Sequence, residues 1–493
     1  MLLHAGPFHM MYEQGSLRRI CLGEEEVLRM IYAALRDRNW GTYPVRIEAE
    51  TVEQDADSFV CRCLMLHPDA EGRSVFRWQV QISGSSGGVI EFGIDGEALV
   101  DVWKNRAGFC VLHPIRGLGN APVELLHTDG SRSRSVFPDL IAAANPFHGL
   151  RGMRWAAGGR GYRLDFEGEV FETEDQRNWT DASYKTFCTP LARPFPVLLR
   201  RGERVQQRIR FQPDSQPLAA GGGTRPLPGT VPSAPLRLGT CASALEPEAA
   251  AWLRTLGLSH LRADVYPGAP GWIPALRAAC DQAAGLALPL ELVLHLRAPF
   301  GASFEAFRAV WDAATPLAQV LLLAEDALAT PQPLIGLLPD IRAALGNPLA
   351  GVGTDFNFAE LNRNRFDPGA ADFVSFSLHP QEHAFDDQSL MENTEAQYDA
   401  VRSAAAVYGL PVHVSPITLR KRFNPYASDP AQRAVPRSSQ ADPRQHTEFA
   451  AEWTRASLQQ LTAAGAASAT YYLAGDLAGA LGPYPAYHAL ARA

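Results

Sequence analysis

Hydrophobic and polar positions alternate in short runs through the first 212 residues. Six segments show this pattern clearly: 58–67, 75–82, 89–94, 108–114, 162–171 and 197–211. Alternation with a period of two is typical of half-buried strands, and many short strands without intervening helical patterns indicate a β-sandwich. The run 24–36 is compatible with a helix or with an edge strand. We therefore predict an all-β, sandwich-like N-terminal domain.

From residue 236 onward, short apolar runs alternate with segments of helical periodicity. Eight apolar runs are candidate strands: 236–241, 261–266, 291–296, 320–325, 351–358, 373–379, 412–417 and 469–473. Helical patterns lie between most of them, at 247–256, 273–285, 304–314, 334–345, 389–408 and 446–464. Eight strand–helix units in about 258 residues match an α/β (β/α)8 TIM barrel in number and size. An open doubly wound sheet is the competing arrangement.

The two patterned regions are joined by a segment without periodicity. Residues 213–235 read PDSQPLAAGGGTRPLPGTVPSAP and are rich in Pro, Gly and Ser, which is the composition of a linker. The predicted organisation is a β-sandwich-like domain over residues 1–212, a linker over 213–235 and a catalytic barrel over 236–493.

Composition and charge narrow the class of protein. The 493 residues are 46% hydrophobic and 20% charged, which is enough for two or three globular domains. The net charge of −8, without a basic block, argues against nucleic acid as a partner. Seven scattered cysteines without CxxC spacing favour a reducing compartment over a disulfide framework. We also expect no signal peptide and no membrane span, and hence a cytoplasmic protein, whereas the oligomeric state stays open.

One motif in the N-terminal region matches a known catalytic pattern only formally. Residues 84–88, GSSGG, fit the G-x-S-x-G nucleophile elbow, but that elbow requires a strand–turn–helix context. Alternating strands flank the motif, so we predict a hairpin loop. The chain contains neither a P-loop nor a Rossmann fingerprint, so nucleotide chemistry has no support.

Within the predicted barrel strands, alternate residues form an apolar set and a polar set. Strand side chains point to opposite faces in turn, so the apolar set should face the helices and the polar set the barrel interior. The polar set is Arg262, Asp264, His295, Arg297, Glu325, Asp355, Asn357, Ser375, Ser377, His379, His413 and Ser415. Burying isolated charges is costly, so this set requires an ion-pair network, a polar ligand or both. Catalytic groups of TIM barrels lie at the carboxyl ends of the strands.

The loops after the fifth and sixth strands carry further polar groups. Glu360, in FAELNRNR, could bind a polyol or carboxylate, or could cap the following loop. The run HPQEHAFDD matches H-x-x-E-H, and His379, His383 and Asp386 could then hold a divalent metal. That chemistry needs a helix, and Pro380 just past a strand argues against one. We therefore expect no cofactor and assign no metal ligands.

Four sequence blocks resemble the D-apionate lactonase family. The first is ETEDQRNWTDASYKTF (172–187), which by composition alone could be a surface hairpin with a structural tryptophan. The others are GTDFNFAELNR (353–363), SFSLHPQEHAFDD (375–387) and VSPITLRKRFNP (414–425). The resemblance covers most of the chain. It implies a β-sandwich-like domain fused to a barrel, and hydrolysis of D-apionolactone to D-apionate in apiose catabolism.

Lactone hydrolysis requires an activated water, stabilisation of the carbonyl oxygen and a proton for the departing alkoxide. We predict Glu325 or Asp355 as the base, and His379 or His295 as the acid or oxyanion donor. Substrate-binding candidates are Arg262, Asp264, Asn357 and Glu360 in the barrel, with Asn178, Asp181 and Lys185 closing the mouth from the N-terminal domain.

Two other functions remain open on the sequence. A glycoside hydrolase could use Glu325 with Asp355 or Glu360 as its two carboxylates. Against it, the seventh strand ends in Ser415-Pro416-Ile417, without a carboxylate. A non-catalytic carbohydrate-binding protein would gain support if arginines neutralised the inward carboxylates.

Overall fold

The computed structural model describes residues 1–215, 235–427 and 440–492. Most of the predicted linker, residues 216–234, lies outside the described residues. Among the described residues, no helix combines the length and the apolar character needed to cross a lipid bilayer.

The chain forms two compact units. The first contains Met1–Gln176 and the described chain from Ser183 to residue 215. The second contains the barrel region, and it also takes in the short segment Arg177–Ala182. Six residues from within the N-terminal sequence therefore belong to the second unit.

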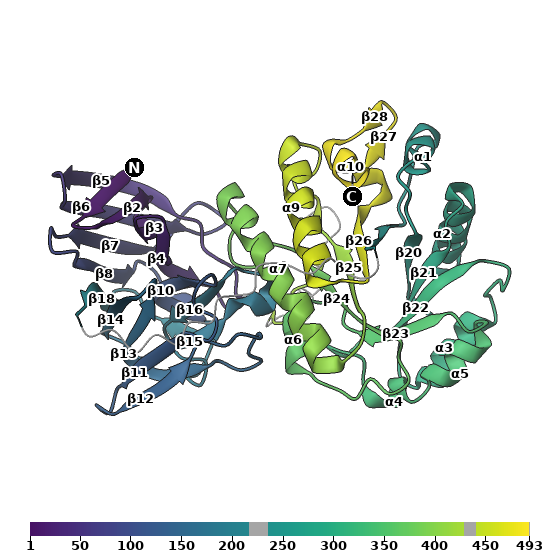
Figure 1. The fold of residues 1–493 in the computed structure, drawn as a ribbon, viewed down its shortest axis with the longest axis horizontal. Coiled ribbons are helices and arrows are strands. Elements are labelled where there is room, and N and C mark those ends of the chain that lie inside the picture. The colour runs from purple at the N-terminus through teal and green to yellow at the C-terminus, as the bar shows by residue number, and fades with distance from the viewer. Residues whose placement is uncertain (216–234, 428–439, 493) are drawn as a thin grey trace. The chain divides into compact units, whose positions relative to one another are not determined.

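The first unit is built on one antiparallel sheet of 16 strands within residues 1–215 (Figure 1). The strands are β1 (Leu2–Ala5), β2 (Phe8–Glu13), β3 (Ser16–Leu22), β4 (Glu25–Arg36), β5 (Arg46–Gln54), β6 (Phe59–Pro68), β7 (Ser74–Gly84), β8 (Ile90–Ala98), β10 (Arg106–Pro114), β11 (Pro122–His127), β12 (Arg132–Val136), β13 (Phe147–Ala157), β14 (Arg160–Glu167), β15 (Phe171–Asp175), β16 (Ser183–Phe187) and β18 (Arg204–Asp214). Their order is β1-β2-β3-β4-β10-β16-β15-β13-β14-β18-β8-β7-β6-β5, with β11 joined to β13 and β12 to β11. A separate two-stranded ribbon pairs β9 (Val102–Lys104) with β17 (Val197–Leu199).

Aromatic contacts show that this sheet folds back on itself. Phe92 of β8 and Phe109 of β10 lie 5.0 Å apart between ring centroids, although five strands separate β8 from β10 in the sheet order. Phe8 of β2 and Phe211 of β18 lie 5.2 Å apart in the same way. Inner faces that pack against each other are the defining feature of a β-sandwich, so the sandwich-like prediction is confirmed.

Three local predictions in the first unit can be compared with the structure. Residues 25–36 form β4, which pairs with β3 and with β10, so this run is an interior strand and neither a helix nor an edge. Residues 84–88 connect the antiparallel pair β7 and β8, which confirms the hairpin loop. The single run predicted over 162–171 is wrong, because the chain turns between β14 and β15. Gly168 has φ +89° there, and a Cβ would lie 2.1 Å from the carbonyl oxygen of Gln206.

The second unit is a closed barrel of eight parallel strands (Figure 1), which confirms the (β/α)8 prediction. The strands are β19 (Arg237–Cys241), β20 (His260–Val265), β21 (Leu290–Leu296), β22 (Leu317–Ala324), β23 (Leu349–Gly353), β24 (Phe373–Leu378), β25 (Val412–Ile417) and β26 (Ser468–Leu473). Each strand pairs with the next, and β26 closes the barrel on β19.

Helices follow most of the barrel strands. They are α1 (Pro247–Leu253), α2 (Trp272–Leu286), α3 (Phe300–Arg308), α4 (Gln332–Ile335), α5 (Leu338–Ala344), α6 (Phe358–Arg363), α7 (Asp387–Tyr408), α9 (Glu448–Ala464) and α10 (Pro485–Leu490). Shorter elements are the 3-10 turns η1 (Gln176–Trp179) and η3 (Ala474–Asp476) and the strands β27 (Ala478–Gly479) and β28 (Gly482–Pro483). Gly409 and Gly465 follow α7 and α9 in the left-handed conformation, which ends each helix.

The fifth barrel strand is shorter than its sequence predicted. The run 351–358 was expected to be a strand throughout, but β23 ends at Gly353 and α6 begins at Phe358. The Thr354 hydroxyl accepts a hydrogen bond from the Phe356 amide at 3.1 Å, a local bond that turns the chain away from the sheet. Asp355 therefore lies in the loop at the carboxyl end of β23.

In each barrel strand, the alternate side chains that are apolar pack against the helices. Leu292, Leu294 and Leu296 of β21 lie in one core cluster with Phe304 and Phe307. The opposite parity contributes a smaller apolar cluster inside the barrel, made of Val293, Leu321, Leu323 and Phe373. Most of the other side chains that point into the barrel are polar, and they form the candidate site.

Candidate active site

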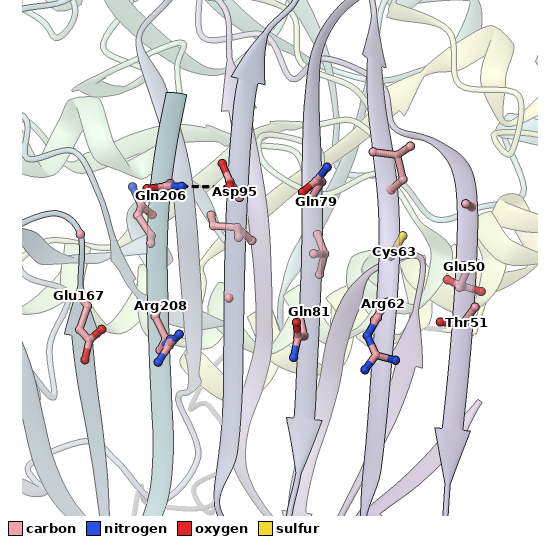
Figure 2. Close-up of a pocket in the computed structure, with 17 residues that line it drawn as sticks. Glu50, Thr51, Arg62, Cys63, Gln79, Gln81, Asp95, Glu167, Gln206 and Arg208 are labelled. Carbon is pink, nitrogen blue, oxygen red and sulfur yellow. Dashed lines mark hydrogen bonds between the residues drawn. The ribbon is translucent and has the colours of Figure 1, made fainter. Parts of the chain in front are cut away.

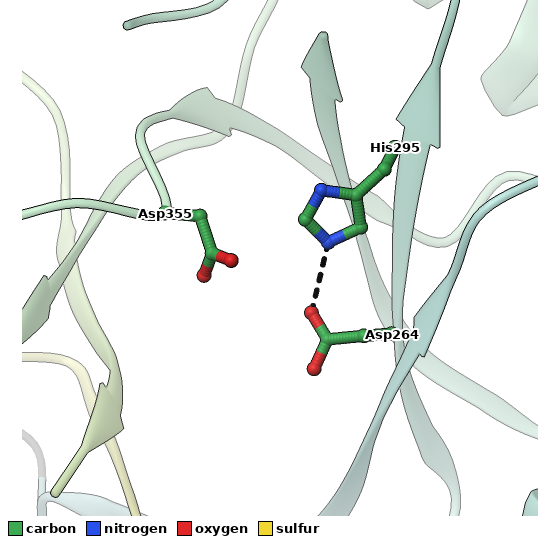
Figure 3. Close-up of side chains that lie close together, drawn as sticks. All are labelled: Asp264, His295 and Asp355. Atoms are coloured by element: carbon green, nitrogen blue, oxygen red, sulfur yellow. Dashed lines mark hydrogen bonds and ion pairs between the residues drawn. The ribbon is translucent and has the colours of Figure 1, made fainter. Parts of the chain in front are cut away.

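Three side chains from different strands meet at the carboxyl end of the barrel. Asp264 lies in β20, His295 in β21 and Asp355 directly after β23. Figure 3 shows the imidazole of His295 bonded to Asp264, with Asp355 facing the same ring. One nitrogen or oxygen atom from each side chain lies within 4.8 Å of the others. Parallel strands bring their carboxyl ends to one rim, which explains how residues 91 positions apart come together.

Two arginines hold the two carboxylates. Nη2 of Arg262 donates to Asp264 Oδ1 at 2.6 Å and to Asp355 Oδ1 at 2.7 Å. Nη1 of Arg422, from the loop after β25, donates to the same oxygen of Asp355 at 2.7 Å. The Arg262 side chain is fully buried, whereas that of Arg422 is 17% exposed. The two positive and two negative charges compensate one another, as burial requires.

The environment of Asp264 keeps its carboxyl group ionised. Burial by itself would raise the pKa of Asp264, but the positive charge of Arg262, the hydrogen bond from His295 and the charge of Arg422 lower it well below its usual range. An ionised carboxylate only accepts hydrogen bonds. The 2.9 Å bond between Asp264 Oδ1 and His295 Nε2 therefore has the imidazole as its donor.

This hydrogen bond fixes the tautomer of His295. In a neutral imidazole with a proton on Nε2, the other nitrogen, Nδ1, is an acceptor. The ring is also stacked on Tyr266, with centroids 4.0 Å apart and planes inclined by 10°. His295 is thus held in one orientation with Nδ1 available to take a proton.

Two cavities adjoin this cluster and share Tyr266 and Phe423 in their walls. A larger one of about 470 Å³ is lined by Arg262, Asp264 and Arg422. A smaller one of about 60 Å³ is lined by His295, Asp355 and Glu325. The larger volume is suited to a small polar ligand, and the smaller one is wide enough for water.

Asp355 has one oxygen that the arginines do not occupy. Among the described residues, its buried Oδ2 atom has no hydrogen-bond partner. A buried polar atom without a partner is costly. This oxygen is therefore a candidate contact for a substrate hydroxyl or a reacting water.

Glu325 lies at the edge of the site rather than within the cluster. It directly follows β22, and its Oε2 accepts from Nε of Arg297 at 2.8 Å. The Arg297 side chain is 71% exposed. Glu325 lines the smaller cavity with Asp355, so the structure brings both predicted bases to one wall.

His379 and Asn357 form a second polar group. Their side chains meet at 3.2 Å between His379 Nε2 and Asn357 Nδ2, and neither residue lines the two cavities. Burial, with a smaller effect from Lys421, lowers the pKa of His379 to about 3. A neutral His379 carries no imidazolium proton, which disfavours it as the acid for the departing alkoxide.

The residues of the H-x-x-E-H match have separate partners. Nδ1 of His383 bonds Asp181 Oδ2 at 2.5 Å, and Asp386 caps the N-terminus of α7 through the Ser389 amide. In the part of the chain that the structure describes, the one group of three clustered ligand side chains is Asp264, His295 and Asp355. His379, His383 and Asp386 are thus not among the ligand side chains that the described structure brings together.

The cluster of Asp264, His295 and Asp355 has the donor types that a divalent cation uses. However, Arg262 and Arg422 already neutralise both carboxylates. A cation there would add positive charge beside two guanidinium groups. This charge balance favours a metal-free site.

Four other predicted binding residues are used in packing. Asn178 accepts from Asn362 of α6 at 3.0 Å, and Asp181 accepts from Asn393 of α7 at 2.9 Å. Glu360 is buried in the first turns of α6. Lys185 lies in β16 of the first unit, where it forms an ion pair with Glu174 and lies 4.9 Å from the Phe187 ring centroid. None of the four lines either cavity.

Sequence reasoning missed Arg422, Tyr266 and Phe423, which line the larger cavity. Arg422 and Phe423 lie in a loop, where the sequence has no periodicity from which the direction of a side chain could be predicted. Their only signal was their place in the block 414–425. Tyr266 follows β20 with the apolar character of a core residue.

Buried neutral histidines make the barrel sensitive to acid. Burial lowers the pKa values of His379 and His413 to about 3. The unfolded chain, with histidine pKa near 6.5, binds more protons than the folded state as pH falls below this value. We expect the free energy of unfolding to decrease from pH 6.5 to 4.5 by at most about 1.4 kcal/mol per pH unit for each histidine.

Urea unfolding at several pH values measures this slope. His379→Gln should flatten it, whereas the control His446→Gln, at a side chain that is 48% exposed, should leave it unchanged. An unchanged slope in His379→Gln would contradict the expectation.

A wider depression lies in the first unit, on the outer face of the sheet (Figure 2). Its volume is about 900 Å³, and exposed polar side chains of β5 to β8 and β18 line it. Figure 2 shows one hydrogen bond among them, from Gln206 to Asp95 at 3.0 Å. Asp95 also pairs with Arg204. We interpret this surface as the solvated face of the sheet.

Comparison with known families finds two matching family models. Residues 1–216 match a model described as "D-apionate lactonase, N-terminal domain". Residues 238–492 match one described as "D-apionate lactonase, TIM barrel domain". The D-apionate lactonase of Brucella anthropi is 32% identical over 500 residues, covering 95% of this chain and 81% of that protein.

Two solved structures illustrate a distant similarity in fold. An endo-1,4-β-D-mannanase from Thermotoga petrophila RKU-1 aligns with a TM-score of 0.35 and 13% identity, covering 52% of this chain and 98% of that one. A β-arabinopyranosidase aligns with a TM-score of 0.30 and 8% identity, covering 100% of this chain and 85% of that one. These scores are too low to support an argument about function.

Proposed function

The chain belongs to the D-apionate lactonase family, and on this premise we propose that it hydrolyses D-apionolactone to D-apionate in apiose catabolism. The coarser activity, a lactone-opening carboxylic-ester hydrolase, follows from family membership. The observation that supports a hydrolytic site in this barrel is the oriented pair Asp264–His295 beside Asp355 and Arg422.

His295 acts as the general base in the proposed mechanism. Its Nδ1 takes a proton from water as the water oxygen adds to the lactone carbonyl carbon. Asp264 holds the tautomer and stabilises the imidazolium that forms, which is the role of a carboxylate in a histidine-based dyad. This assignment differs from the bases expected on the sequence, Glu325 and Asp355.

Arg422 stabilises the oxyanion of the tetrahedral intermediate. Both arginines line the larger cavity, but Arg422 is the more exposed of the two, and its planar fork can bind more than one oxygen. Arg262 is fully buried, and its nitrogens contact Asp264, Asp355 and Ser415. Arg262 therefore positions the carboxylates rather than contacting the substrate.

The ring-opening step returns the proton. The bond between the carbonyl carbon and the ring oxygen breaks, and the imidazolium of His295 gives its proton to the departing alkoxide. The products are a free hydroxyl and a carboxylic acid, which ionises at neutral pH. Oδ2 of Asp355 can accept a hydrogen bond from the water or from a substrate hydroxyl. The small-molecule lactone is the only partner that this mechanism requires.

A panel of sugar-acid lactones tests the proposal, with proton release as the readout. We expect D-apionolactone to have the highest kcat/KM, and we expect a chelator to leave the rate unchanged because arginines hold the carboxylates. Aryl glycosides form a second arm of the assay. Cleavage of glycosides without turnover of any lactone would overturn the proposal, and inhibition by the chelator would overturn the metal-free mechanism.

A further inference from the structure

A third carboxylate, Glu291, is buried beneath the candidate site. It lies in β21, is completely inaccessible to solvent and lines neither cavity. Its Oε2 accepts hydrogen bonds from the hydroxyls of Ser415 at 3.0 Å and Thr470 at 2.9 Å. The same oxygen lies 3.2 Å from Nε2 of His260. The mechanism above gives this group no role.

Ser415 connects Glu291 to Arg262. The Ser415 hydroxyl has one proton, which it donates to Glu291, so its oxygen is left to accept from Nη1 of Arg262 at 3.0 Å. The other nitrogens of Arg262 donate to Asp264 and Asp355. Each of the three guanidinium nitrogens thus has a defined acceptor.

The surroundings of Glu291 keep it negatively charged. Burial alone would raise its pKa, but the hydrogen bond and charge of His260, followed by the charge of Arg262, lower it to about 2. The ionised Glu291 therefore always accepts a hydrogen bond from Ser415, whose oxygen in turn accepts one from Arg262.

His260 is held beside Glu291 by hydrogen bonds at both ring nitrogens. The Ser259 hydroxyl donates to the Leu238 carbonyl at 2.8 Å, so its oxygen accepts from His260 Nδ1 at 2.8 Å. The Thr470 hydroxyl donates to Glu291, so its oxygen accepts from His260 Nε2 at 2.8 Å. Both ring nitrogens of His260 thus face hydroxyl oxygens, which holds the imidazole beside Glu291.

We propose that Glu291 is a positioning residue that, through the Ser415 hydroxyl, holds Arg262 where it orients Asp264 and Asp355. The effect on turnover rests on the proposed function, because it is measured on lactone hydrolysis. Asp264 in turn fixes the tautomer of His295. A small shift of Arg262 would therefore move Asp264 and, through it, change the orientation of His295.

Ser415→Ala and Thr470→Val form a matched pair of variants. Each removes one hydroxyl bond to the same oxygen of Glu291 in the same buried layer, but only Ser415 contacts Arg262. We expect Ser415→Ala to lower kcat by about 10–100-fold with little change in KM. Thr470→Val should keep the wild-type kcat while losing comparable thermal stability.

Glu291→Gln completes the kinetic test. It keeps the side-chain shape but removes the charge, and it should lower kcat in the same direction as Ser415→Ala. The double variant Glu291→Gln/Ser415→Ala should be no slower than the slower single variant. Both changes disrupt the same pair of hydrogen bonds from Arg262 through Ser415 to Glu291. Equal kcat values for Ser415→Ala and Thr470→Val would overturn the inference.

Nitrogen-15 NMR of the arginine side chains supplies a readout that does not depend on turnover. The Nη1 protons of Arg262, which the Ser415 hydroxyl accepts, should exchange slowly with solvent in the wild type and in Thr470→Val, and faster in Ser415→Ala. Slow exchange in all three proteins would overturn the positioning role. Absence of lactone turnover in the wild type would instead overturn the proposed function, while the exchange rates would still decide whether Ser415 holds Arg262.

Discussion

Replacing His295 by glutamine is expected to lower kcat/KM for lactone hydrolysis by about 10²–10⁴-fold, the usual contribution of a general base. The glutamine amide can still donate to Asp264 from the position of Nε2, so the local structure is kept. It offers no basic nitrogen at the position of Nδ1. The loss should fall mainly on kcat, since His295 acts in the chemical step. Initial rates of proton release measure it.

Asp264→Asn supplies the companion variant. It removes the negative charge and one of the two acceptor oxygens that Asp264 shares between Arg262 and His295, so the bond that fixes the tautomer of His295 competes with the bonds from Arg262. Because the two residues act as a unit, the double variant should be hardly slower than His295→Gln alone. Arg342→Met is the control, since Arg342 pairs with Asp372 and lines neither cavity. Near wild-type turnover in folded His295→Gln would show that the base lies elsewhere.

Replacing Arg262 by methionine is expected to destabilise the barrel by about 3–5 kcal/mol at pH 7, the range found when one partner of a buried pair is removed. The change leaves Asp264 and Asp355 with Arg422 as their remaining arginine. In the wild type, the depressed pKa of Asp264 contributes stability that is present above the unfolded value, near 3.9, and is lost as pH falls through the folded value. The penalty in the variant should therefore shrink as the carboxylate of Asp264 becomes protonated.

Denaturant unfolding at pH 7 and at about pH 3, below the unfolded value near 3.9, measures this difference. Arg342→Met is the matched control, because Arg342 pairs with Asp372 at 2.6 Å but both side chains are partly exposed, at 24% and 34%. Such a pair is worth at most about 1 kcal/mol. An Arg262→Met penalty no larger than that of Arg342→Met would mean that the buried carboxylates find other compensation.

The sequence predicted the architecture because periodicity reports burial. Leu292, Leu294 and Leu296 alternate as a strand with one helix-facing side requires, and the structure places all three in the outer core. Features that depend on a residue's own neighbours along the chain were therefore predictable.

The arrangement of the site was less predictable, because its contacts join distant residues. The parity of Asp264 and His295 indicated that they face inward, but not that they hydrogen-bond to each other. Arg422 comes from a loop and neutralises Asp355 across 67 positions of sequence. Phe356 and Phe358 alternate like strand residues, yet a single Thr354 hydroxyl bond ends the strand before them.

The membership of Arg177–Ala182 in the second unit has a consequence for dissecting the protein into fragments. Arg177 donates to Asp399 of α7 at 3.0 Å, and both side chains are only 3% exposed. A fragment that starts after residue 235 would keep Asp399 but lose Arg177, and would also lose the contacts that Asp181 makes with His383 and Asn393. The barrel is thus assembled from two non-contiguous stretches of polypeptide. Expression clones, split versions and fusions of the barrel must supply both stretches to reproduce its native packing.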